Sequence, residues 1–257
     1  MNGFHSMAQP LEGDEIERYA RHIVLREIGG PGQAKLKAAR VLVVGAGGLG
    51  SPVLAYLAAA GVGLIGIADD DRVSLSNLQR QIIHDTDSVG EAKTTSAARA
   101  IARINPHVRV VSHDERIKAD NAIDMMTGYD LVVDGSDSFG TRHLLAEAAE
   151  QCGIPMVMAA VGRFDGSVTV LAPHLADEAG NANPRLSDLF PEAPPPGAVP
   201  SCAEAGIVGA LTGVIGTLQA MEVIKLITGA GNPLIGRLLL YDGLEARFDT
   251  IRYRRKG

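Results

Sequence analysis

The stretch VLVVGAGGLG, residues 41–50, decides the fold of this chain. Its four leading apolar residues predict a short strand buried on both faces, as in a parallel sheet. The glycines that follow fit the pattern G-x-G-x-x-G, which joins such a strand to a helix in nucleotide-binding folds. Gly45 permits the tight turn, while Gly47 and Gly48 let a phosphate or a ribose approach the backbone. Gly50 lets the following helix pack on the sheet.

Strands and helices alternate on both sides of this stretch. Helices are expected at residues 14–28, 52–60, 88–104 (capped by Ser88), 120–127 and 139–151, and further strands at 64–69, 108–111, 131–134 and 155–160. This alternation predicts an α/β fold of the Rossmann-like, doubly wound type, with a mainly parallel sheet and helices on both faces.

The pattern changes after residue 160. Strands at residues 166–173, 237–241 and 246–252, with a long helix at 205–228, predict a C-terminal antiparallel extension of the sheet. Residues 174–204 are irregular and rich in proline, which predicts a long functional crossover loop. We expect an N-terminal extension over residues 1–13 and one domain over residues 14–257.

Composition excludes several classes of protein. The net charge of -6 argues against a general nucleic-acid binder. The two cysteines, Cys152 and Cys202, suit a reducing cytosol and exclude a disulfide framework. No charged-then-apolar leader opens the chain, and the apolar run 205–221 contains Gln219 and is short for a membrane span. We therefore expect a cytoplasmic protein that contacts neither membrane nor nucleic acid.

A carboxylate completes the nucleotide pattern. Asp69 ends the second strand 24 residues after Gly45, where it can hold the hydroxyls of a ribose. The N-terminus of the helix after the glycines faces the phosphates with its free amides. These features predict an adenine nucleotide without choosing between NAD and ATP. For Asp71, solvation of the strand end is the simpler interpretation, with orientation of neighbouring groups as the alternative.

The polar segment SNLQRQ, residues 76–81, favours ATP. An α-phosphate accumulates charge while a nucleophile attacks it and pyrophosphate leaves, so phosphoryl transfer requires donors that hydride transfer does not. Asn77, Arg80 and Lys93 supply an amide, a guanidinium and an ammonium group. Asp137 follows the fourth strand, where a carboxylate can hold magnesium through one ligand and several waters.

Taken together, these segments resemble the HesA/MoeB/ThiF family, the bacterial relatives of ubiquitin-activating enzymes. The similarity runs from about residue 14 to 250, and within the family it is greatest to molybdopterin-synthase adenylyltransferases, followed by thiamine-pathway enzymes. The motifs that carry it are RYARHI (18–23), GAGGLGSPV (45–53), AGVG (60–63), DDDRVSLSNLQRQ (69–81), VGEAK (89–93), INP (104–106) and SCAEAGIVGALTGVIGTLQAMEVIK (201–225).

The resemblance implies an adenylyltransferase. Such an enzyme uses ATP to adenylate the C-terminal Gly-Gly carboxylate of a ubiquitin-like sulfur-carrier protein and releases pyrophosphate. The positions that match those binding ATP or its magnesium are Gly48, Asp69, Ser76, Asn77, Arg80, Lys93 and Asp137. To this predicted binding set we add Gly45, Gly47, Gly50, Asp71 and Gln79, from the same motifs.

Two further residues have roles that rest on the resemblance. Arg21 matches an arginine that reaches into the ATP site of a neighbouring subunit, which implies a homodimer. Cys202 matches a cysteine that some members link covalently to the carrier. A thiol near a helix N-terminus can be activated as a thiolate, while a small buried residue is the alternative interpretation of Cys202.

The chain departs from most relatives at the zinc site. Those relatives carry two C-x-x-C pairs, whereas Arg185 and Asp188 stand here before LFP (189–191), and YRRKG (253–257) follows without the second pair. Two cysteines cannot form a four-cysteine site, so we predict no zinc. The crossover loop must then be held by packing or stay mobile until a partner binds. The family's usual Asp-Asn is Asp137-Ser138, and sulfur is expected from a separate donor protein.

Three other interpretations remain open at this point. An NAD-dependent oxidoreductase is supported only by GAGGLG and Asp69 and predicts a substrate domain that the sequence does not show. A related activating enzyme acting on a peptide or tRNA-nucleoside carboxylate is the second. The third is a non-catalytic nucleotide-binding partner, which has no need for the combined set Arg21, Asn77, Arg80, Lys93 and Asp137.

Overall fold

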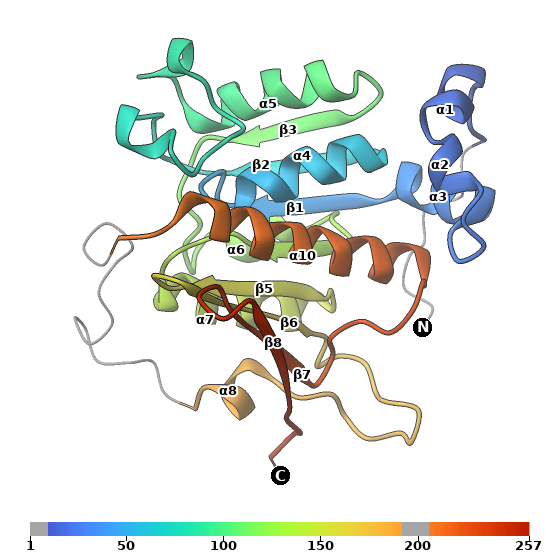
Figure 1. The fold of residues 1–257 in the computed structure, drawn as a ribbon. Coiled ribbons are helices and arrows are strands. Elements are labelled where there is room, and N and C mark those ends of the chain that lie inside the picture. Colours follow the sequence, from blue (N-terminus) through green and yellow to red (C-terminus); the bar gives the residue numbers. More distant parts are fainter. Residues whose placement is uncertain (1–9, 192–205, 257) are drawn as a thin grey trace.

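The structure is a computed structural model that describes residues 10–191 and 206–256. Its centre is an eight-stranded sheet with the order β3-β2-β1-β4-β5-β6-β7-β8 (Figure 1). The first five strands of this order run parallel, and β6, β7 and β8 extend the sheet antiparallel. The strands are β1 Arg40–Val44, β2 Leu64–Ala68, β3 Arg109–His113, β4 Leu131–Asp134, β5 Met156–Val161, β6 Asp165–Leu171, β7 Arg237–Asp242 and β8 Arg247–Arg252.

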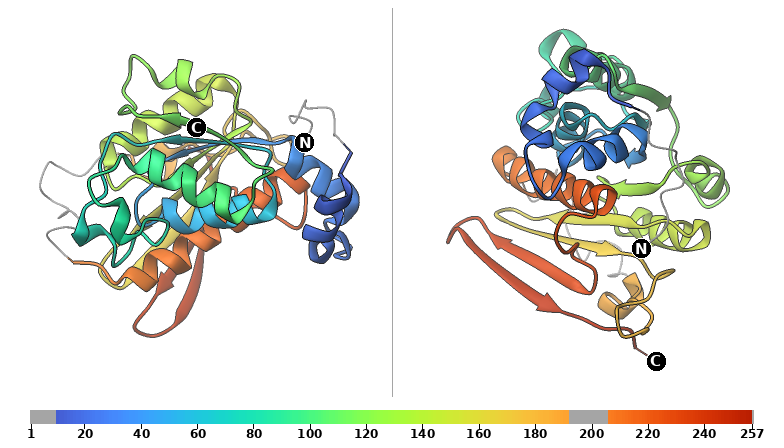
Figure 2. Two further views of the ribbon diagram at one scale, coloured as in Figure 1. Left: turned by 90° about the horizontal axis from the view of Figure 1, so that it is seen from above. Right: turned by 90° about the vertical axis from the view of Figure 1, so that its right-hand side faces the viewer.

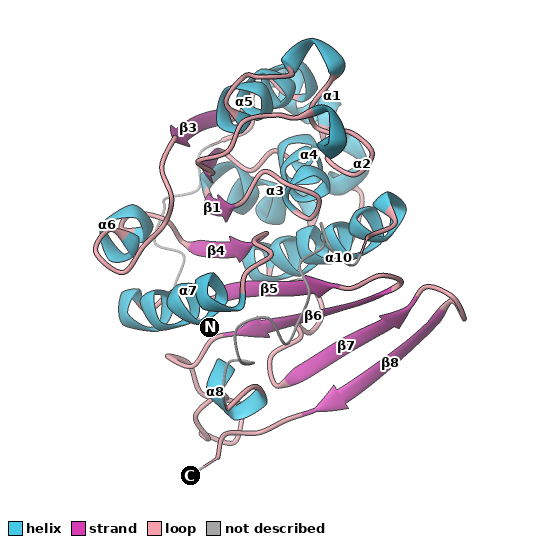
Figure 3. Cartoon of the chain, turned by 90° about the vertical axis from the view of Figure 1, so that its left-hand side faces the viewer, coloured by secondary structure: helices cyan, strands magenta, loops and turns pink. Residues whose placement is uncertain are grey.

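Helices cover both faces of the sheet, which confirms the predicted fold class (Figure 3). One face packs against α3, α4, α5 and α10, and the other against α6, α7 and α8. The helices are α1 Gly13–Arg18, α2 Ala20–Ile23, α3 Gly29–Ala38, α4 Gly50–Ala60, α5 Lys93–Ile104, α6 Ala122–Met126, α7 Phe139–Cys152, α8 Leu186–Leu189 and α10 Gly209–Thr228, with 3-10 turns at Leu75–Asn77 and Thr86–Ser88.

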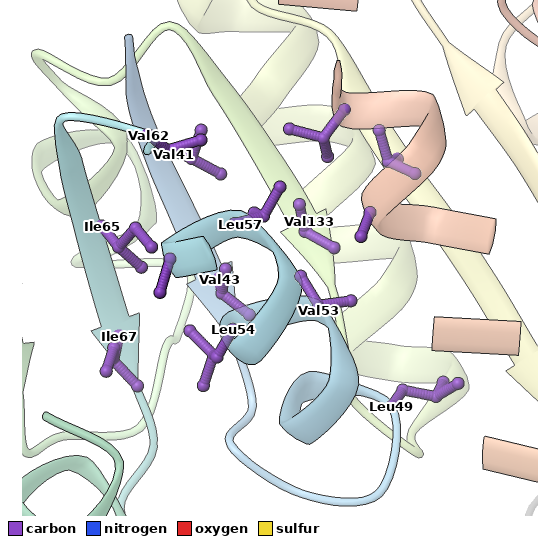
Figure 4. Packing of buried hydrophobic residues seen from close by; sticks show 14 of the residues in the cluster. Val41, Val43, Leu49, Val53, Leu54, Leu57, Val62, Ile65, Ile67 and Val133 are labelled. Atoms are coloured by element: carbon purple, nitrogen blue, oxygen red, sulfur yellow. The ribbon is translucent and has the colours of Figure 1, made fainter. Parts of the chain in front are cut away.

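The strand β1 shows why the sheet is buried on both faces. Val41 and Val43 belong to the cluster under α4, while Leu42 and Val44 belong to the opposite cluster with α6 and α7. This alternation follows from the two-residue period of a strand. Figure 4 shows Val43 beside Leu54 of α4, and Val41 near Val62. The parallel half of the sheet therefore has a continuous core on each side.

Helix α10 is a core helix, although it is long and apolar enough to cross a membrane by length and composition alone. Half of its apolar window is buried inside the protein. Gln219 is fully buried, and its Nε2 donates to the carbonyls of Asp134 at 2.8 Å and Val157 at 3.3 Å. A Cβ on Gly216 would lie 2.5 Å from the carbonyl oxygen of Leu49, so this glycine permits close packing on α4.

Several expected helix boundaries are wrong. The helix expected over residues 14–28 is two short helices that break at the buried Tyr19, whose hydroxyl accepts a hydrogen bond from Asn105 Nδ2 at 2.7 Å. Helix α3 was not predicted. The cap expected at Ser88 is also wrong: α5 begins at Lys93, because Gly90 takes a φ of +90° between the 3-10 turn and the helix.

Part of the expected crossover loop, residues 174–204, is ordered by polar contacts. The Asp188 carboxylate accepts the backbone amide of Arg185 at 2.7 Å and that of Lys256 at 2.9 Å. Arg255 Nη1 donates to the carbonyl oxygen of Asn183 at 3.2 Å. We call these five residues the C-terminal clasp. The clasp joins residues 183–188 to the chain after β8. Among the described residues, this part of the expected loop is therefore held by polar contacts as well as by apolar packing.

The clasp also determines the charge state of Asp188. Burial raises the pKa of its carboxyl. The two backbone amides and the charges of Arg255 and Arg185 lower this pKa by more, so the net pKa lies below the ordinary value. Residues 192–205 lie outside the described residues, as does the expected start of the long helix at 205. Within the described chain that helix begins at Gly209.

Candidate nucleotide-binding site

A cavity of about 1250 Å³ lies at the carboxyl ends of the parallel strands. Ligands bind at this edge in open α/β sheets, where the loops after neighbouring strands meet. Eight residues of the predicted site line it: Gly45, Gly47, Gly48, Asp69, Asp71, Arg80, Lys93 and Asp137. The opposite wall comes from the antiparallel extension, including the β7–β8 hairpin at the outer edge of the sheet (Figure 2).

The glycine-rich loop has the close contacts that its sequence predicts. Gly45 has a φ of +95°, and a Cβ there would lie 2.8 Å from the carbonyl oxygen of Gly135. A Cβ on Gly50 would lie 1.9 Å from the carbonyl oxygen of Gly45, so Gly50 closes α4 onto the loop and does not line the cavity. Gly47 faces the cavity, and a Cβ there would meet only Gln81 Nε2, at 3.6 Å. A ligand can therefore approach the backbone at Gly47.

Two side chains fix the position of this loop through Ala46. Asp69 Oδ2 accepts the Ala46 amide at 2.8 Å. His84 Nε2 donates to the Ala46 carbonyl at 2.9 Å, and its Nδ1 accepts from the Ser96 hydroxyl at 2.8 Å. Burial of this imidazole lowers the pKa of His84, which keeps the ring neutral. No motif identified His84 in the sequence, because its contacts are to residues far away in the chain.

The ammonium group of Lys93 is a buried cation of the cavity wall. Lys93 is 5% exposed, and its Nζ lies 2.7 Å from Asp71 Oδ2 and 3.9 Å from Asp69 Oδ2. Burial raises the pKa of Asp69, although Lys93 and two backbone amides act in the opposite direction. Asp71 is well exposed and pairs with Lys93, which agrees with an orienting role. The buried ammonium can hold a phosphate of a ligand.

The loop after β4 presents Asp137 to the same cavity. Beneath it the buried Asp134 carboxylate accepts from Arg142 Nε at 3.0 Å, from the Ser136 amide at 3.0 Å and from the Ser136 hydroxyl at 2.5 Å. Arg142 is 4% exposed and also donates to the carbonyl of Ala159 at 3.0 Å. This network fixes the loop that carries Asp137. Neither Asp134 nor Arg142 was identified from the sequence.

Three predicted site residues of SNLQRQ, namely Ser76, Asn77 and Gln79, do not line the cavity. The 3-10 turn Leu75–Asn77 directs Ser76 and Asn77 to Ser74, where Asn77 Oδ1 accepts the Ser74 amide at 3.3 Å. The Gln79 side chain is exposed, and its carbonyl packs against Gly209 at the start of α10. Arg80 does line the cavity and donates from Nη1 to the Ser76 carbonyl at 3.1 Å. Gln81, which was not predicted, lines it as well.

Arg21 and Cys202 are not among the described residues that line the cavity. Arg21 is exposed on α2, at the end of the sheet opposite to the cavity (Figure 1). Cys202 lies outside the described residues. The cavity of one chain therefore contains neither of them among its described residues.

The donor set fits ATP and magnesium. The cavity offers open backbone at Gly47, the carboxylate of Asp69, and cations in Lys93 and Arg80. Magnesium prefers carboxylate oxygens, and Asp137 presents an exposed carboxylate on this wall. Asp69, Asp70 and Asp71 also lie close enough together to share a cation. However, Asp69 and Asp71 face Lys93, and Asp70 pairs with Arg116 at 3.1 Å.

Known proteins resemble the chain in sequence. It is 49% identical to the probable adenylyltransferase/sulfurtransferase MoeZ of Mycobacterium tuberculosis, over 96% of this chain and 62% of MoeZ, so it spans less than two thirds of that relative. It is 49% identical to the sulfur carrier protein adenylyltransferase of Thermus thermophilus, over 94% of this chain and 89% of the relative. The SAMP-activating enzyme E1 of Haloferax volcanii is 45% identical over 96% of this chain and 89% of the relative.

Solved structures share the fold at lower identity. PaaA superposes with a TM-score of 0.80 at 21% identity, over 98% of this chain and 77% of PaaA. E. coli MccB in complex with MccA-N7isoASN gives 0.80 at 21% identity, over 93% of this chain and 72% of MccB. The ThiF family profile matches residues 19–257. With this match and the geometry of the glycine-rich loop, the chain belongs to the ThiF family.

Proposed function

We propose that this protein adenylates the C-terminal carboxylate of a ubiquitin-like sulfur-carrier protein, using ATP and magnesium and releasing pyrophosphate. The observation that carries the proposal is the buried ammonium of Lys93 beside the glycine-rich loop, with Arg80 and Asp137 on the same cavity. The relative from Thermus thermophilus, named as a sulfur carrier protein adenylyltransferase, supports the substrate. A hydride-transfer site would not require this arrangement of charges.

Each group of the cavity has a part in binding the nucleotide. The amides after Gly47 and the N-terminus of α4 face the phosphates, and Asp69 accepts hydrogen bonds from the ribose. Lys93 and Arg80 neutralise the oxygens of the α-phosphate as charge accumulates there. Asp137, with the phosphates, would hold magnesium, and the ion would supply further neutralisation of phosphate charge.

The carrier tail has room on the side of the antiparallel strands. The cavity continues from the loop after β4 to Tyr241, Arg247 and Asp249 of the β7–β8 hairpin. An extended tail lying there brings its terminal carboxylate to the α-phosphorus. A bond forms between a carboxylate oxygen and that phosphorus, the bond to the β-phosphate oxygen breaks, and pyrophosphate leaves with the electron pair. The enzyme contributes mainly position and charge neutralisation.

A homodimer in which Arg21 acts on the neighbouring subunit is part of this proposal. Arg21 lies away from the cavity of its own chain, so any role at a phosphate requires a second copy. Mixing tests this directly. Arg21→Ala and Lys93→Met subunits should each be inactive, and re-associated mixtures should partly recover activity, because one site of a mixed dimer carries both side chains. Mixtures with no recovered activity would remove Arg21 from the site.

The reaction is tested by ATP–pyrophosphate exchange with magnesium. We expect exchange with a carrier that ends in Gly-Gly and none with the same carrier lacking its last glycine. Arg80→Ala and Asp137→Ala should each lower exchange about a hundredfold or more while leaving the fold intact. The surface variants Arg109→Ala and Asp124→Ala, both away from the cavity wall, serve as matched controls. ATP binding without exchange for any carrier would point to a different carboxylate, on a peptide or a tRNA nucleoside.

Cys202 and the sulfur source belong to later steps. Adenylation does not require a thiol, so Cys202→Ala should leave pyrophosphate release unchanged and abolish any thiol-sensitive adduct with the carrier. An adduct that persists in this variant would place the covalent link elsewhere. Sulfur is proposed to come from a separate donor protein, since neither adenylation nor the cavity provides a persulfide.

A further inference from the structure

Gln81 is a buried amide of the cavity wall that the function proposed above does not use. Its side chain is 4% exposed and lines the cavity. Its Nε2 faces the backbone of Gly47, where a Cβ would lie only 3.6 Å away. Among the described residues its Oε1 is buried without a hydrogen-bond partner.

A second buried glutamine shows what a structural role looks like. Gln219 also has an unpartnered Oε1, but its Nε2 donates to two carbonyls, and it does not line the cavity. Those two bonds join α10 to β4 and β5, so the stability of the fold accounts for Gln219. No hydrogen bond links the side-chain amide of Gln81 to the rest of the described chain. A buried polar group without a partner is unfavourable, and an apolar side chain of the same shape would be tolerated better.

The position of Gln81 indicates which ligand atom it meets. The Ala46 amide is held by Asp69, the carboxylate placed for the ribose, and Gly47 is the next residue. The phosphate nearest the ribose is therefore the one that passes Gly47. We propose that Gln81 is a substrate-contacting residue whose Nε2 donates a hydrogen bond to an α-phosphate oxygen of ATP. This inference rests on the proposed use of ATP at the cavity.

A neutral amide donor suits this position. Lys93 and Arg80 already supply positive charge, and an amide adds a directed donor beside the helix N-terminus without further charge. As pyrophosphate leaves, the oxygens of the α-phosphate gain negative charge, and a donor fixed in place becomes more effective. Bound nucleotide would thus give the Nε2 donor of Gln81 the acceptor that no described residue supplies.

The inference is tested by nucleotide affinity. Dissociation constants for ATP, AMP and adenosine should be measured by calorimetry on the full chain and on Gln81→Met. ATP and AMP should each bind about ten- to a hundredfold more weakly, as expected for a lost hydrogen bond to a charged group, while adenosine binds equally. Gln151→Met is the matched control, since Gln151 is exposed on α7 about 18 Å along the helix from its start at the cavity. Unchanged ATP affinity, or an equal loss for adenosine, would overturn the inference.

Thermal unfolding of the nucleotide-free protein separates this role from a structural one. The melting midpoint of Gln81→Met should equal or exceed that of the wild type, whereas Gln219→Met should lower it. A Gln81→Met protein that melts early or does not fold would contradict the inference, because it would make Gln81 structural. Gln81→Glu, which keeps the shape but loses the N–H donor, should weaken ATP and AMP at least as much as Gln81→Met. If the wild type binds no ATP, the proposed function fails; if it adenylates a carrier and Gln81→Met does so equally well, only this inference fails.

Discussion

The parallel half of the molecule, residues 40–161, and the antiparallel half around β6–β8 differ in how they are built. Strand β1 is buried on both faces of the sheet, and the loops that follow the parallel strands carry the groups placed at the phosphates. In contrast, all six residues of β8 are exposed, and the C-terminal clasp holds the chain that follows it. Both halves line the cavity, and in the function proposed above the parallel half would hold the nucleotide while the antiparallel half would provide a wall for the substrate that carries the carboxylate.

The largest expected effect lies in the parallel half, at Gly50. An added methyl group in Gly50→Ala would meet the backbone of Gly45 at 1.9 Å, so α4 cannot dock on the loop. We expect a loss of about 3 kcal/mol or more in the free energy of unfolding, measured with urea. Gly213→Ala is the control, because a Cβ there meets nothing within 4 Å and alanine favours a helix. Equal stability of the two variants would contradict this account of the loop.

Lys93→Met should have the next largest effect and should act on catalysis more than on stability. It removes the cation between Asp69 and Asp71 and the donor for the phosphate. We expect kcat/KM for adenylation to fall about a thousandfold. Lys118→Met, at an exposed lysine away from the cavity wall, should keep wild-type activity. Turnover in Lys93→Met close to that of the wild type would move the phosphate site elsewhere.

Asp188→Ala probes the antiparallel half. It removes both backbone hydrogen bonds of the clasp and should lower the free energy of unfolding by about 1 kcal/mol. ATP affinity should stay unchanged, while KM for the carrier should rise because the hairpin wall is less firmly held. Asp120→Ala, at an exposed aspartate far along the chain, is the control. A loss of ATP affinity in Asp188→Ala would break the division between the two halves.

The same carboxylate gives a pH dependence of defined sign. Because the pKa of Asp188 is lowered in the folded protein, its contribution is fully present above the unfolded value of 3.8 and is lost as the pH falls through the folded value. As the pH falls below about 3.8, the free energy of unfolding of the wild type should therefore decrease more steeply than that of Asp188→Ala. Parallel acid-titration curves for the two proteins would show that the clasp does not hold the charge.

The smallest expected effect is the pH response of the glycine-rich loop. The pKa of His84 is lowered mainly by burial, so the unfolded chain takes up a proton near pH 6.5 while the folded chain stays neutral. Stability should therefore fall as the pH drops below about 6.5. His84→Gln should flatten this part of the curve of melting midpoint against pH. Some slope should remain, since burial also lowers the pKa of His174.

The sequence predicted the parallel half well because its signals are local. Four apolar residues and a glycine pattern specify a strand, a turn and a helix within about ten positions, and the loop geometry at Gly45 and Gly50 agrees with that prediction. Which side chains of SNLQRQ face the cavity could not be predicted in the same way. The 3-10 turn Leu75–Asn77 determines which side chains face the cavity, so Arg80 and Gln81 reach it and Gln79 does not.

Other features depend on contacts between distant parts of the chain. His84 contacts Ala46, Arg142 donates to the carbonyl of Ala159, and Asp188 contacts the C-terminal residues. No spacing rule connects such pairs, because the fold brings them together only after the sheet has formed. The prediction of no zinc and the roles of Arg21 and Cys202 stay predictions: Arg21 lies away from the cavity of its own chain, and Cys202 lies outside the described residues.

The most direct measurement is detection of the carrier acyl-adenylate. The enzyme, ATP, magnesium and a Gly-Gly carrier from the same cell are mixed, quenched in acid, and analysed by intact-protein mass spectrometry. We predict a carrier species that is heavier by one AMP moiety, with the added mass on its last glycine. The species should be absent with Lys93→Met or without the terminal glycine. A folded, ATP-binding enzyme that leaves the carrier unmodified, or that modifies it at another residue, would contradict the central claim.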